Sequence, residues 1–480
     1  GNDMKPKKLI IAILCILLMF FGKFLPPIMG LSQLGMAALT IFIGTLVMML
    51  AMDTVWSGFV TLLASASTGL FTFTQAVQTA LGNSIFWFLI IGTMVLGAME
   101  RTGLLKRLAF SLIRRPFVHK SPWMFISAFL LSAYLTATLM NLTATVLLFL
   151  ALCANMMQEL KIEKGSPFAA QLMASIMIVC VMANGMTALG HSVPLVGISL
   201  FEGYQSLSIA QYSIVGFFIG LVALVLYILM LRFVFRMDAK CLANFDVSAL
   251  VEMQGPMSKA EKIAACMFVG IILYWLVPSF IQNALPDVYK FMNSQFSFIA
   301  PFIIALILMC LIHIDGKPMM DVKQEFKNVP WGPMFMIAIA MFLGSVIQNK
   351  DAGLVDTLSA AAAPMFSGMS PVLFVGIISL LCIILTQFTS NTLCLMLAGS
   401  VAIALMGGGA ITGVHGGAMS LALGIAASCG FATAPGSAPA AILAGQGWID
   451  SKYQMKMGFI SAFAFWIMSL VAYVAAAAIY

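Results

Sequence analysis

Two short polar segments that resemble each other carry the side chains of this sequence best suited to binding an ion. Residues 135–141 read LTATLMN and residues 385–391 read LTQFTSN, so Leu, Thr and Asn recur at the same three positions. The amides of Asn141 and Asn391, with the hydroxyls beside them, can donate hydrogen bonds to an anion or offer oxygens to a cation. These residue types therefore favour the reversible binding of a small ion.

A second polar interruption follows each of these segments further along the chain. Residues 187–194 read TALGHSVP and residues 433–439 read TAPGSAP. Gly185, Gly190 and Pro194 are expected to break the first apolar helix, and Pro435, Gly436 and Pro439 the second, with Ser or Thr hydroxyls at each break. An ordinary kink stabilised by Ser or Thr is the simpler interpretation of a single copy. The duplication favours a binding role for the residues at both breaks.

The surrounding sequence places all four segments in a membrane. The chain of 480 residues is 62% hydrophobic and only 9% charged, with a mean hydropathy of +1.06, which no soluble domain of this length shows. Apolar runs long enough to cross a bilayer recur to the end of the chain, which excludes a lone signal peptide. We expect an all-α polytopic membrane protein with eleven transmembrane helices, at residues 9–25, 34–52, 56–73, 86–99, 168–182 resumed at 195–201, 214–235, 264–280, 296–314, 331–346, 419–428 resumed at 440–446, and 459–478.

The two LT-containing segments lie at the joints of paired short apolar runs. The first pair is 122–139 with 143–157, and the second is 371–385 with 393–405. Each run is short for a complete crossing, so the pairs are interpreted as re-entrant helical hairpins whose tips carry the polar residues. Two half-helix N-termini aimed at one point form an anion site. A tip that only caps its own helix is the alternative, and the duplication argues against it.

The distribution of basic residues sets the topology. With a cytoplasmic N-terminus, 21 Lys and Arg residues fall inside and only Lys23, Lys290 and Lys350 fall outside, as the positive-inside rule requires. The first hairpin then enters from the cytoplasm and the second from outside. Residues 34–235 and 264–478 therefore form an inverted repeat, which is typical of secondary transporters of the cell membrane.

Several other functions are excluded by what the sequence lacks. No Asp or Glu lies in the middle of an expected span, which argues against a proton pump with a carboxylate relay. There is no GxSxG, HExxH or paired-carboxylate motif, so the protein is not expected to be an enzyme. The nine cysteines have no metal-ligand spacing, and no metal site is assigned. The net charge of +7 reflects topology and not nucleic-acid binding.

The chain resembles the divalent anion/sodium symporter family, which contains dicarboxylate and citrate carriers. The second tip, Ser390-Asn391-Thr392, matches the Ser-Asn-Thr signature of that family. Residues 98–107 (AMERTGLLKR) and 440–447 (AAILAGQG) add supporting matches. The resemblance covers nearly the whole chain, and its tip motif is the most specific part.

This resemblance implies a homodimer in membrane lipid, with a static scaffold and a transport domain that moves as an elevator. Residues 4–120 and 264–346 would form the scaffold, residues 121–237 and 347–480 the transport domain, and residues 238–263 a cytoplasmic linker. It implies a small dicarboxylate as the substrate, sodium close to it, and no organic cofactor. The implied substrate-binding residues are Asn141, Thr143, Ser192, Ser390, Asn391, Thr392 and Ser437. The candidates for a cation site, or for a group that replaces the cation, are Thr136, Asn141, His191, Thr386, Asn391 and Gly436.

The departures from the family pattern indicate an asymmetric site. The first tip reads Met140-Asn141-Leu142 and lacks two hydroxyls, for which Thr143 compensates in part. His191 stands before Ser192, where the family has a small residue whose carbonyl helps to hold sodium. An imidazolium there would act as a built-in cation, whereas a neutral ring would only hydrogen-bond to the tip.

We therefore expect a secondary transporter that exchanges small dicarboxylates of the succinate, 2-oxoglutarate or malate type by an elevator mechanism. The first alternative is a sodium-coupled dicarboxylate or citrate symporter. An anion channel built from the same broken helices is an alternative of another class, and an efflux carrier with this architecture also stays open. The sequence does not identify the anion, the direction of transport or the stoichiometry.

Overall fold

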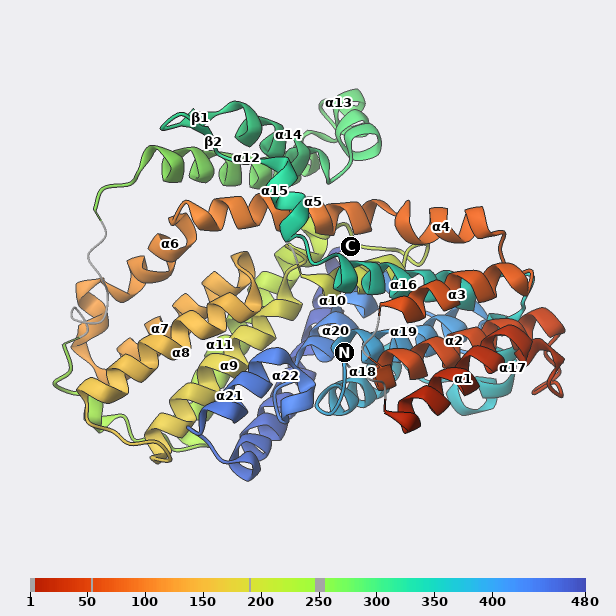
Figure 1. Cartoon of the computed structure of the whole chain (residues 1–480). Helices are drawn as coiled ribbons and strands as arrows, with labels where there is room; N and C mark the ends of the chain where they lie inside the picture. Colours follow the sequence, from red (N-terminus) through yellow and green to blue (C-terminus); the bar gives the residue numbers. More distant parts are fainter. Residues whose placement is uncertain (1–4, 53–54, 190, 247–254) are drawn as a thin grey trace.

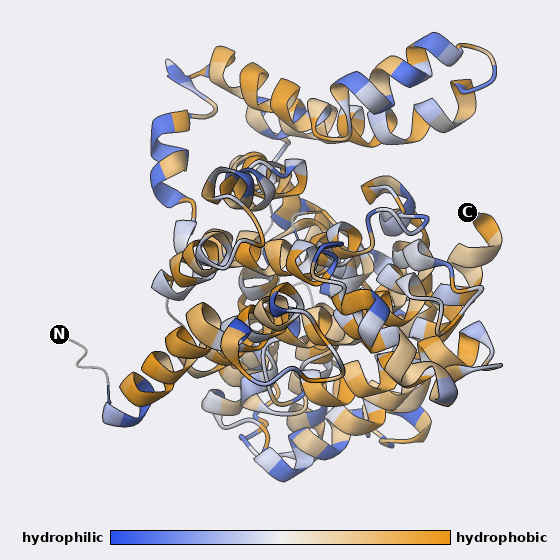
Figure 2. Ribbon diagram, turned by 90° about the vertical axis from the view of Figure 1, so that its right-hand side faces the viewer, coloured by the Kyte–Doolittle hydropathy of each residue, from blue (hydrophilic) through white to orange (hydrophobic). Residues whose placement is uncertain are grey.

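The computed structural model describes residues 5–52, 55–189, 191–246 and 255–480 and is helical almost throughout (Figure 1). The described exception is an antiparallel ribbon of β1 (His313–Ile314) and β2 (Lys317–Pro318). Eight of the described helices are long and apolar enough to cross a membrane, or up to 11 if each of three bent pairs is one span. Figure 2 shows that apolar residues, in orange, make up most of the length of the helices. The predicted all-helical membrane protein is confirmed at this level.

The helices of the first half are α1 (Pro6–Phe21), α2 (Gln33–Met52), α3 (Trp56–Ser67), α4 (Phe73–Leu81), α5 (Ser84–Arg101), α6 (Leu104–Ile113), α7 (Pro122–Leu139), α8 (Leu142–Glu159), α9 (Pro167–Met186), α10 (Ser192–Leu200) and α11 (Ile209–Phe233). Those of the second half are α12 (Lys259–Ile281), α13 (Pro286–Lys290), α14 (Ala300–Leu311), α15 (Val322–Asn328), α16 (Trp331–Ile347), α17 (Leu354–Phe366), α18 (Pro371–Thr386), α19 (Asn391–Gly407), α20 (Gly416–Ser428), α21 (Ala438–Gln446) and α22 (Ser451–Ile479). Short 3₁₀ segments are η1 (Gly22–Phe24), η2 (Pro116–Lys120), η3 (Lys240–Leu242) and η6 (Ala434–Gly436), and η5 (Phe291–Phe296) is a π-helix.

The end of each half has the same order of elements. A short helix (α6 or α17) precedes a helical pair (α7–α8 or α18–α19), then a broken helix (α9–α10 or α20–α21) and a long one (α11 or α22). Both pairs begin with Ser-Pro, and Ser121 and Ser370 cap α7 and α18 through their hydroxyls, as expected at helix N-termini. Helix α17 was not predicted, because its 13 residues are short for a span.

The first arm of the first hairpin, α7, has the predicted bounds, and the second arm, α8, extends beyond the predicted run 143–157 at both ends. Helices α7 and α8 have 18 residues each, a length of about 27 Å, and both pass the length test for a span. Length therefore does not separate a re-entrant pair from two crossings. The arrangement of eleven spans plus two re-entrant hairpins stays a prediction.

Two expected spans are shorter than predicted. The run 56–73 gives α3, which ends at Ser67, and Gly69 then adopts a left-handed conformation with φ +84°. The capping box of Thr72 and Gln75 starts α4 directly afterwards. The run 296–314 likewise gives only the 12 residues of α14, preceded by the π-helix. Between α3 and α4 a left-handed glycine and a capping box thus overrode apolar continuity.

The broken helices α9 and α20 cross each other in the core. A Cβ on Gly185 of α9 would lie 2.7 Å from Cβ of Ser428 and 3.0 Å from the carbonyl oxygen of Gly424, both on α20. Tyr212 of α11 donates a hydrogen bond of 2.8 Å to the Gly185 carbonyl. The sequence pattern assigns Gly185 to the first helix break, but Gly185 lies inside α9 and permits this close crossing. Gly190, the other glycine assigned there, lies outside the described residues.

Helices α12, α13 and α14 and the β ribbon lie together along one side of the molecule, at the top of Figure 1. The ring of Phe88 on α5 lies 5.3 Å from that of Phe298 and 5.0 Å from that of Phe302, at the start of α14. Two ion pairs, Arg101–Glu325 and Arg107–Glu261, add further attachments from α5 and α6. This layer is therefore held to the body by aromatic packing and paired charges.

A close approach between α11 and the end of α9 gives the first testable prediction. A Cβ on Gly216 would overlap the Met186 carbonyl oxygen. We expect Gly216→Ala to cost about 1–3 kcal/mol through overpacking and to lower the thermal unfolding midpoint in detergent. The control Gly92→Ala, where a Cβ meets nothing within 4 Å, should be neutral or stabilising by about 0.5–1 kcal/mol. Equal unfolding midpoints for the Gly216→Ala and Gly92→Ala variants would contradict the close approach of α11 to the end of α9.

Candidate functional site

The second hairpin tip brings several oxygens together. Thr386, the last residue of α18, is buried, and its hydroxyl lies 2.6 Å from Oδ1 of Asn391 and 2.6 Å from the carbonyl oxygen of Ala427. A hydroxyl has one proton and can donate to only one of these oxygens. A turned Asn391 amide explains the other short contact, and a cation among these oxygens is consistent only with the amide that is not turned.

The Asn391 side chain allows both solutions. If its amide is turned, the nitrogen donates to the Gly436 carbonyl at 2.9 Å, the Ala427 carbonyl at 3.1 Å and the Thr386 hydroxyl at 2.6 Å. If it is not turned, an amide oxygen, a hydroxyl and two carbonyls converge without a charged group. Such neutral oxygen sets, with carbonyls released at a helix break, suit sodium. Gly430 is required beside this cluster, since a Cβ there would overlap the Gly436 carbonyl and lie 2.7 Å from Asn391 Oδ1.

Gln387 attaches this tip to the neighbouring broken helix, a role that the sequence did not reveal. Its fully buried side chain donates to the carbonyls of Ile383 and Cys429 at 2.9 and 2.5 Å and accepts from the amides of Phe431 and Ala432 at 3.2 and 3.0 Å. The hydroxyl of Thr433 donates to the Gln387 carbonyl. The sequence feature that could have pointed to this role is the position of Gln387 in the LTQFTSN segment, where the first copy has Ala.

The remaining residues of the second tip line a cavity. Ser390 is exposed and caps α19 by accepting from the Leu393 amide at 3.4 Å, and Thr392 is half-buried. Ser390 and Thr392 line a cavity of about 420 Å³, here called the tip cavity, opposite α2 and α16. Its size is within the range of small-molecule pockets. Among its lining residues, all of them described by the structure, none is charged.

The first tip has a plainer chemistry. The exposed Asn141 side chain caps α8 by accepting from the Ala144 amide at 3.2 Å. Thr143 is half-buried in the first turn of α8, and Met140 and Leu142 flank the cap. Ser437 likewise caps α21 by accepting from the Ala440 amide at 3.2 Å. The side chains of Asn141, Ser390 and Ser437 thus each cap the helix that follows them.

His191 lies among backbone carbonyls at the first break. Its ring is buried, and Nδ1 lies 3.0 Å from the Thr187 carbonyl oxygen. The carbonyls of Ala137 and Met140, at the end of α7, also face the ring. Within the described residues Nε2 has no hydrogen-bond partner. An imidazole ring therefore lies among carbonyls here, whereas the second repeat brings the Asn391 amide together with three oxygens.

The predicted site residues do not all share one cavity. Thr136 and Thr187 line a separate cavity of about 600 Å³ between α7, α11 and α12, here called the α12 cavity. Its lining is mostly apolar, and the Thr136 hydroxyl donates to the Ser132 carbonyl at 2.7 Å. Ser192, half-buried at the start of α10, and Ser437 line neither of these two cavities.

The two repeats are nevertheless packed into one another. Helix α10 of the first repeat packs against α19 and α20 of the second, and α21 packs against α8 and α9. Gly399 of α19 accommodates the Leu200 side chain of α10. The second arm of each hairpin therefore contacts the resumed half of the other repeat's broken helix.

Comparisons with known proteins identify related membrane transporters. The chain is 23% identical over 399 residues to the sodium-dependent dicarboxylate transporter of Staphylococcus saprophyticus, covering 80% of this chain and 75% of that protein. It is 25% identical over 335 residues to an uncharacterised transporter of Haemophilus influenzae, covering 70% and 68%.

In fold, the chain is similar to the crystal structure of the YdaH transporter of Alcanivorax borkumensis. The TM-score is 0.55 at 14% identity, over 98% of this chain and 97% of that one. Residues 4–478 match the family described as the sodium:sulfate symporter transmembrane region. The chain therefore belongs to this family of membrane transporters, the divalent anion/sodium symporter family that its Ser-Asn-Thr tip indicated.

Proposed function

We propose that this protein carries small dicarboxylates across the cell membrane and binds them at the Ser390-Asn391-Thr392 tip. The observation that carries the proposal is the tip cavity, in which two hydroxyls at a helix N-terminus face an uncharged space of small-molecule size. The name of the staphylococcal relative, a sodium-dependent dicarboxylate transporter, supports the same class of substrate.

Charge balance explains why the second tip suits an anion. A divalent anion needs positive charge close by when it leaves water. The tip cavity has no basic side chain among its described lining residues, so the N-terminus of α19, with about half an elementary charge and free amide groups, supplies part of it. A sodium ion among the oxygens of Thr386, Asn391, Ala427 and Gly436 would supply more.

The mode of coupling depends on the first repeat. The His191 ring lies among the carbonyls of Thr187, Ala137 and Met140, so it occupies space that a cation would need. We propose that this ring replaces one coupling ion and favours the exchange of one dicarboxylate for another. Sodium-coupled symport is the second candidate, because the oxygen set at the second tip is suited to sodium. An anion channel is disfavoured, since paired hairpins suit alternating access.

The scaffold, the mobile unit and the dimer belong to the same proposal. The tip cavity lies between α19 on one side and α2 and α16 on the other, so α7–α11 with α17–α22 would move as an elevator against the other helices. The proposed boundaries stay those of residues 121–237 and 347–480. Exposed apolar side chains on α12, including Leu273 and Phe280, offer a surface to a second copy. We also propose that the N-terminus lies in the cytoplasm.

Transport by the purified protein in liposomes tests the proposal directly. We expect labelled succinate or 2-oxoglutarate to enter sodium-free vesicles loaded with unlabelled dicarboxylate and not to accumulate in empty ones. Accumulation in empty vesicles that requires an inward sodium gradient would replace exchange with symport. Absence of dicarboxylate flux under both conditions would overturn the proposed function, and single-channel currents would favour the channel.

The second-tip oxygen set predicts a specific loss. Thr386→Val keeps the shape of the side chain but removes a hydroxyl that contacts Asn391 and Ala427. Loss of a contact to a charged partner costs about 1.5–3 kcal/mol, so sodium stimulation or binding should weaken by a factor of about ten to a hundred. Thr389→Val, beside the set, is the control and should keep its sodium response. Equal responses in both variants would exclude this set as the ion site.

The position of His191 at the first break predicts a gain of sodium dependence, whereas the Thr386 variant predicts a loss. We expect His191→Gly to open space among the carbonyls and make dicarboxylate transport respond to sodium. His191→Gln should slow exchange without producing a sodium response, since its amide still fills the place and can donate to the Thr187 carbonyl. Thermal unfolding in detergent checks that both variants fold. Unchanged ion dependence in His191→Gly would show that the ring is only structural.

A further inference from the structure

A groove on the outer surface of the first repeat is not explained by ion transport. It has a volume of about 670 Å³ and runs between α7 and α11, from Leu131 and Leu221 at one end to Trp123 and Arg232 at the other. Its lining is predominantly aliphatic and aromatic. Val225 and Leu229 on its α11 wall are about half exposed (58% and 49%). Because α11 is a candidate membrane span, this open apolar side faces lipid.

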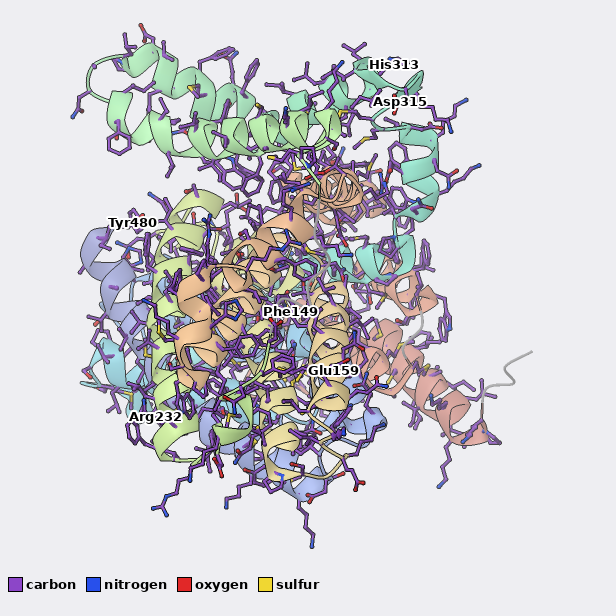
Figure 3. The ribbon with its side chains drawn as sticks, turned by 90° about the vertical axis from the view of Figure 1, so that its left-hand side faces the viewer. Phe149, Glu159, Arg232, His313, Asp315 and Tyr480 are labelled. Atoms are coloured by element: carbon purple, nitrogen blue, oxygen red, sulfur yellow. The ribbon has the colours of Figure 1, made fainter. Side chains whose placement is uncertain are left out.

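The groove has a single cationic group at one end. Arg232 lies in the last turn of α11 (Figure 3). Its guanidinium is 5.5 Å from the ring of Trp123 and 5.6 Å from that of Phe233, within the range of cation–π attraction. Both ion pairs found in the described part of the chain involve other arginines. The rings hold the Arg232 charge in place, and no carboxylate of the described chain neutralises it.

Further polar and basic groups flank this end. Ser121 also lines the groove, and its oxygen accepts from the Met124 amide, so its proton stays available. Lys120 ends the 3₁₀ segment that leads directly into α7. The same end of α11 is followed by Arg236 and Lys240. The groove thus combines a long apolar trough with a basic, hydrogen-bonding end.

The dimensions match one leaflet of a bilayer. From Leu221 to Arg232 the helix rises by about 16 Å, close to half of the hydrocarbon thickness of about 30 Å. A dicarboxylate would find no second cation and few hydrogen-bond donors along such a trough. Basic pockets between transmembrane helices on the cytoplasmic side bind anionic lipid head groups, and the charge distribution places this end in the cytoplasm.

We infer that this groove binds an anionic phospholipid, with its phosphate on Arg232 and Ser121 and an acyl chain along α7 and α11. Helix α7 carries the first hairpin tip at its other end, and α11 packs against the broken helix α9. The lipid would therefore connect the first hairpin arm to the unit that holds the first break. This site is independent of the substrate and of the coupling ion.

Native mass spectrometry of the full-length protein in detergent tests the site, with phosphatidylglycerol and phosphatidylcholine of matched chains as probes. We expect the wild-type protein to bind phosphatidylglycerol about fivefold better, the factor that one basic side chain contributes at an anionic surface. Arg232→Gln should lose this preference but keep phosphatidylcholine binding. Lys452→Gln, which removes an exposed lysine at the start of α22, should keep it. Ser127→Trp, in the wall of the groove, should reduce the binding of both lipids.

Thermal unfolding of each variant without lipid checks that it folds, and Arg232→Gln is the decisive variant if Ser127→Trp is unstable. The same phosphatidylglycerol preference in wild type, Arg232→Gln and Lys452→Gln would overturn the proposal. Stabilisation of the wild type by inorganic phosphate as large as that by phosphatidylglycerol would also overturn it, because the site would then bind free anions. A lipid effect that appears only when two copies associate would assign the groove to a subunit contact instead.

Discussion

Backbone groups released at two helix breaks, in surroundings without water, are the constraint on which this structure depends. Each released N–H or C=O needs a partner in an apolar interior. At the second break the Gln387 side chain partners three backbone groups, those of Cys429, Phe431 and Ala432, and its own carbonyl accepts from Thr433. The interruption is thereby made rigid, and the oxygens near Asn391 are held close together. The proposed ion site would then be a consequence of how the break is satisfied.

The first break meets the same constraint in a different way. The position of Gln387 is taken by Ala137, which has no polar side chain. There the Thr187 hydroxyl lies 3.4 Å from the Thr138 carbonyl, and the His191 ring accounts for the carbonyl of Thr187. One ring thus takes over part of what an amide network does in the other repeat. If the imidazole carries a proton, as the proposed exchange requires, satisfying the backbone and supplying positive charge would be the same task at His191.

The sequence predicted those parts of the fold that repeat and missed those that depend on tertiary contacts. The hairpin tips and the resumed helices α10 and α21 lie close to where polar residues and Pro interrupt apolar runs. The end of α3 was missed because a left-handed Gly69 and the Thr72 capping box act locally within an apolar run. Gly185 was assigned to a break, although its function is close packing against α20. Only the packing partner distinguishes these two uses of glycine.

The residues of the candidate site could be predicted from the sequence, but which of them lie close together could not. Asn391, Thr386 and Gly436 do converge, whereas Thr136 lines a different cavity from Ser390 and Thr392. Sequence spacing locates a residue along a helix, but the face it presents depends on how α10, α19 and α21 pack across the repeats. Gln387 could not be recognised because a buried glutamine and a surface glutamine look alike in a sequence.

The capping hydrogen bonds also bear on how strongly an anion can be held. Asn141, Ser390 and Ser437 each occupy one amide at a helix N-terminus, and a helix start has four unsatisfied amides. The remaining amides and the helix dipole can then attract an anion without any fixed positive side chain. A lysine or arginine in the tip cavity would bind a dicarboxylate more tightly and would slow its release. A carrier must release its substrate on the other side, so neutral caps and partial charges suit it better than a full ion pair.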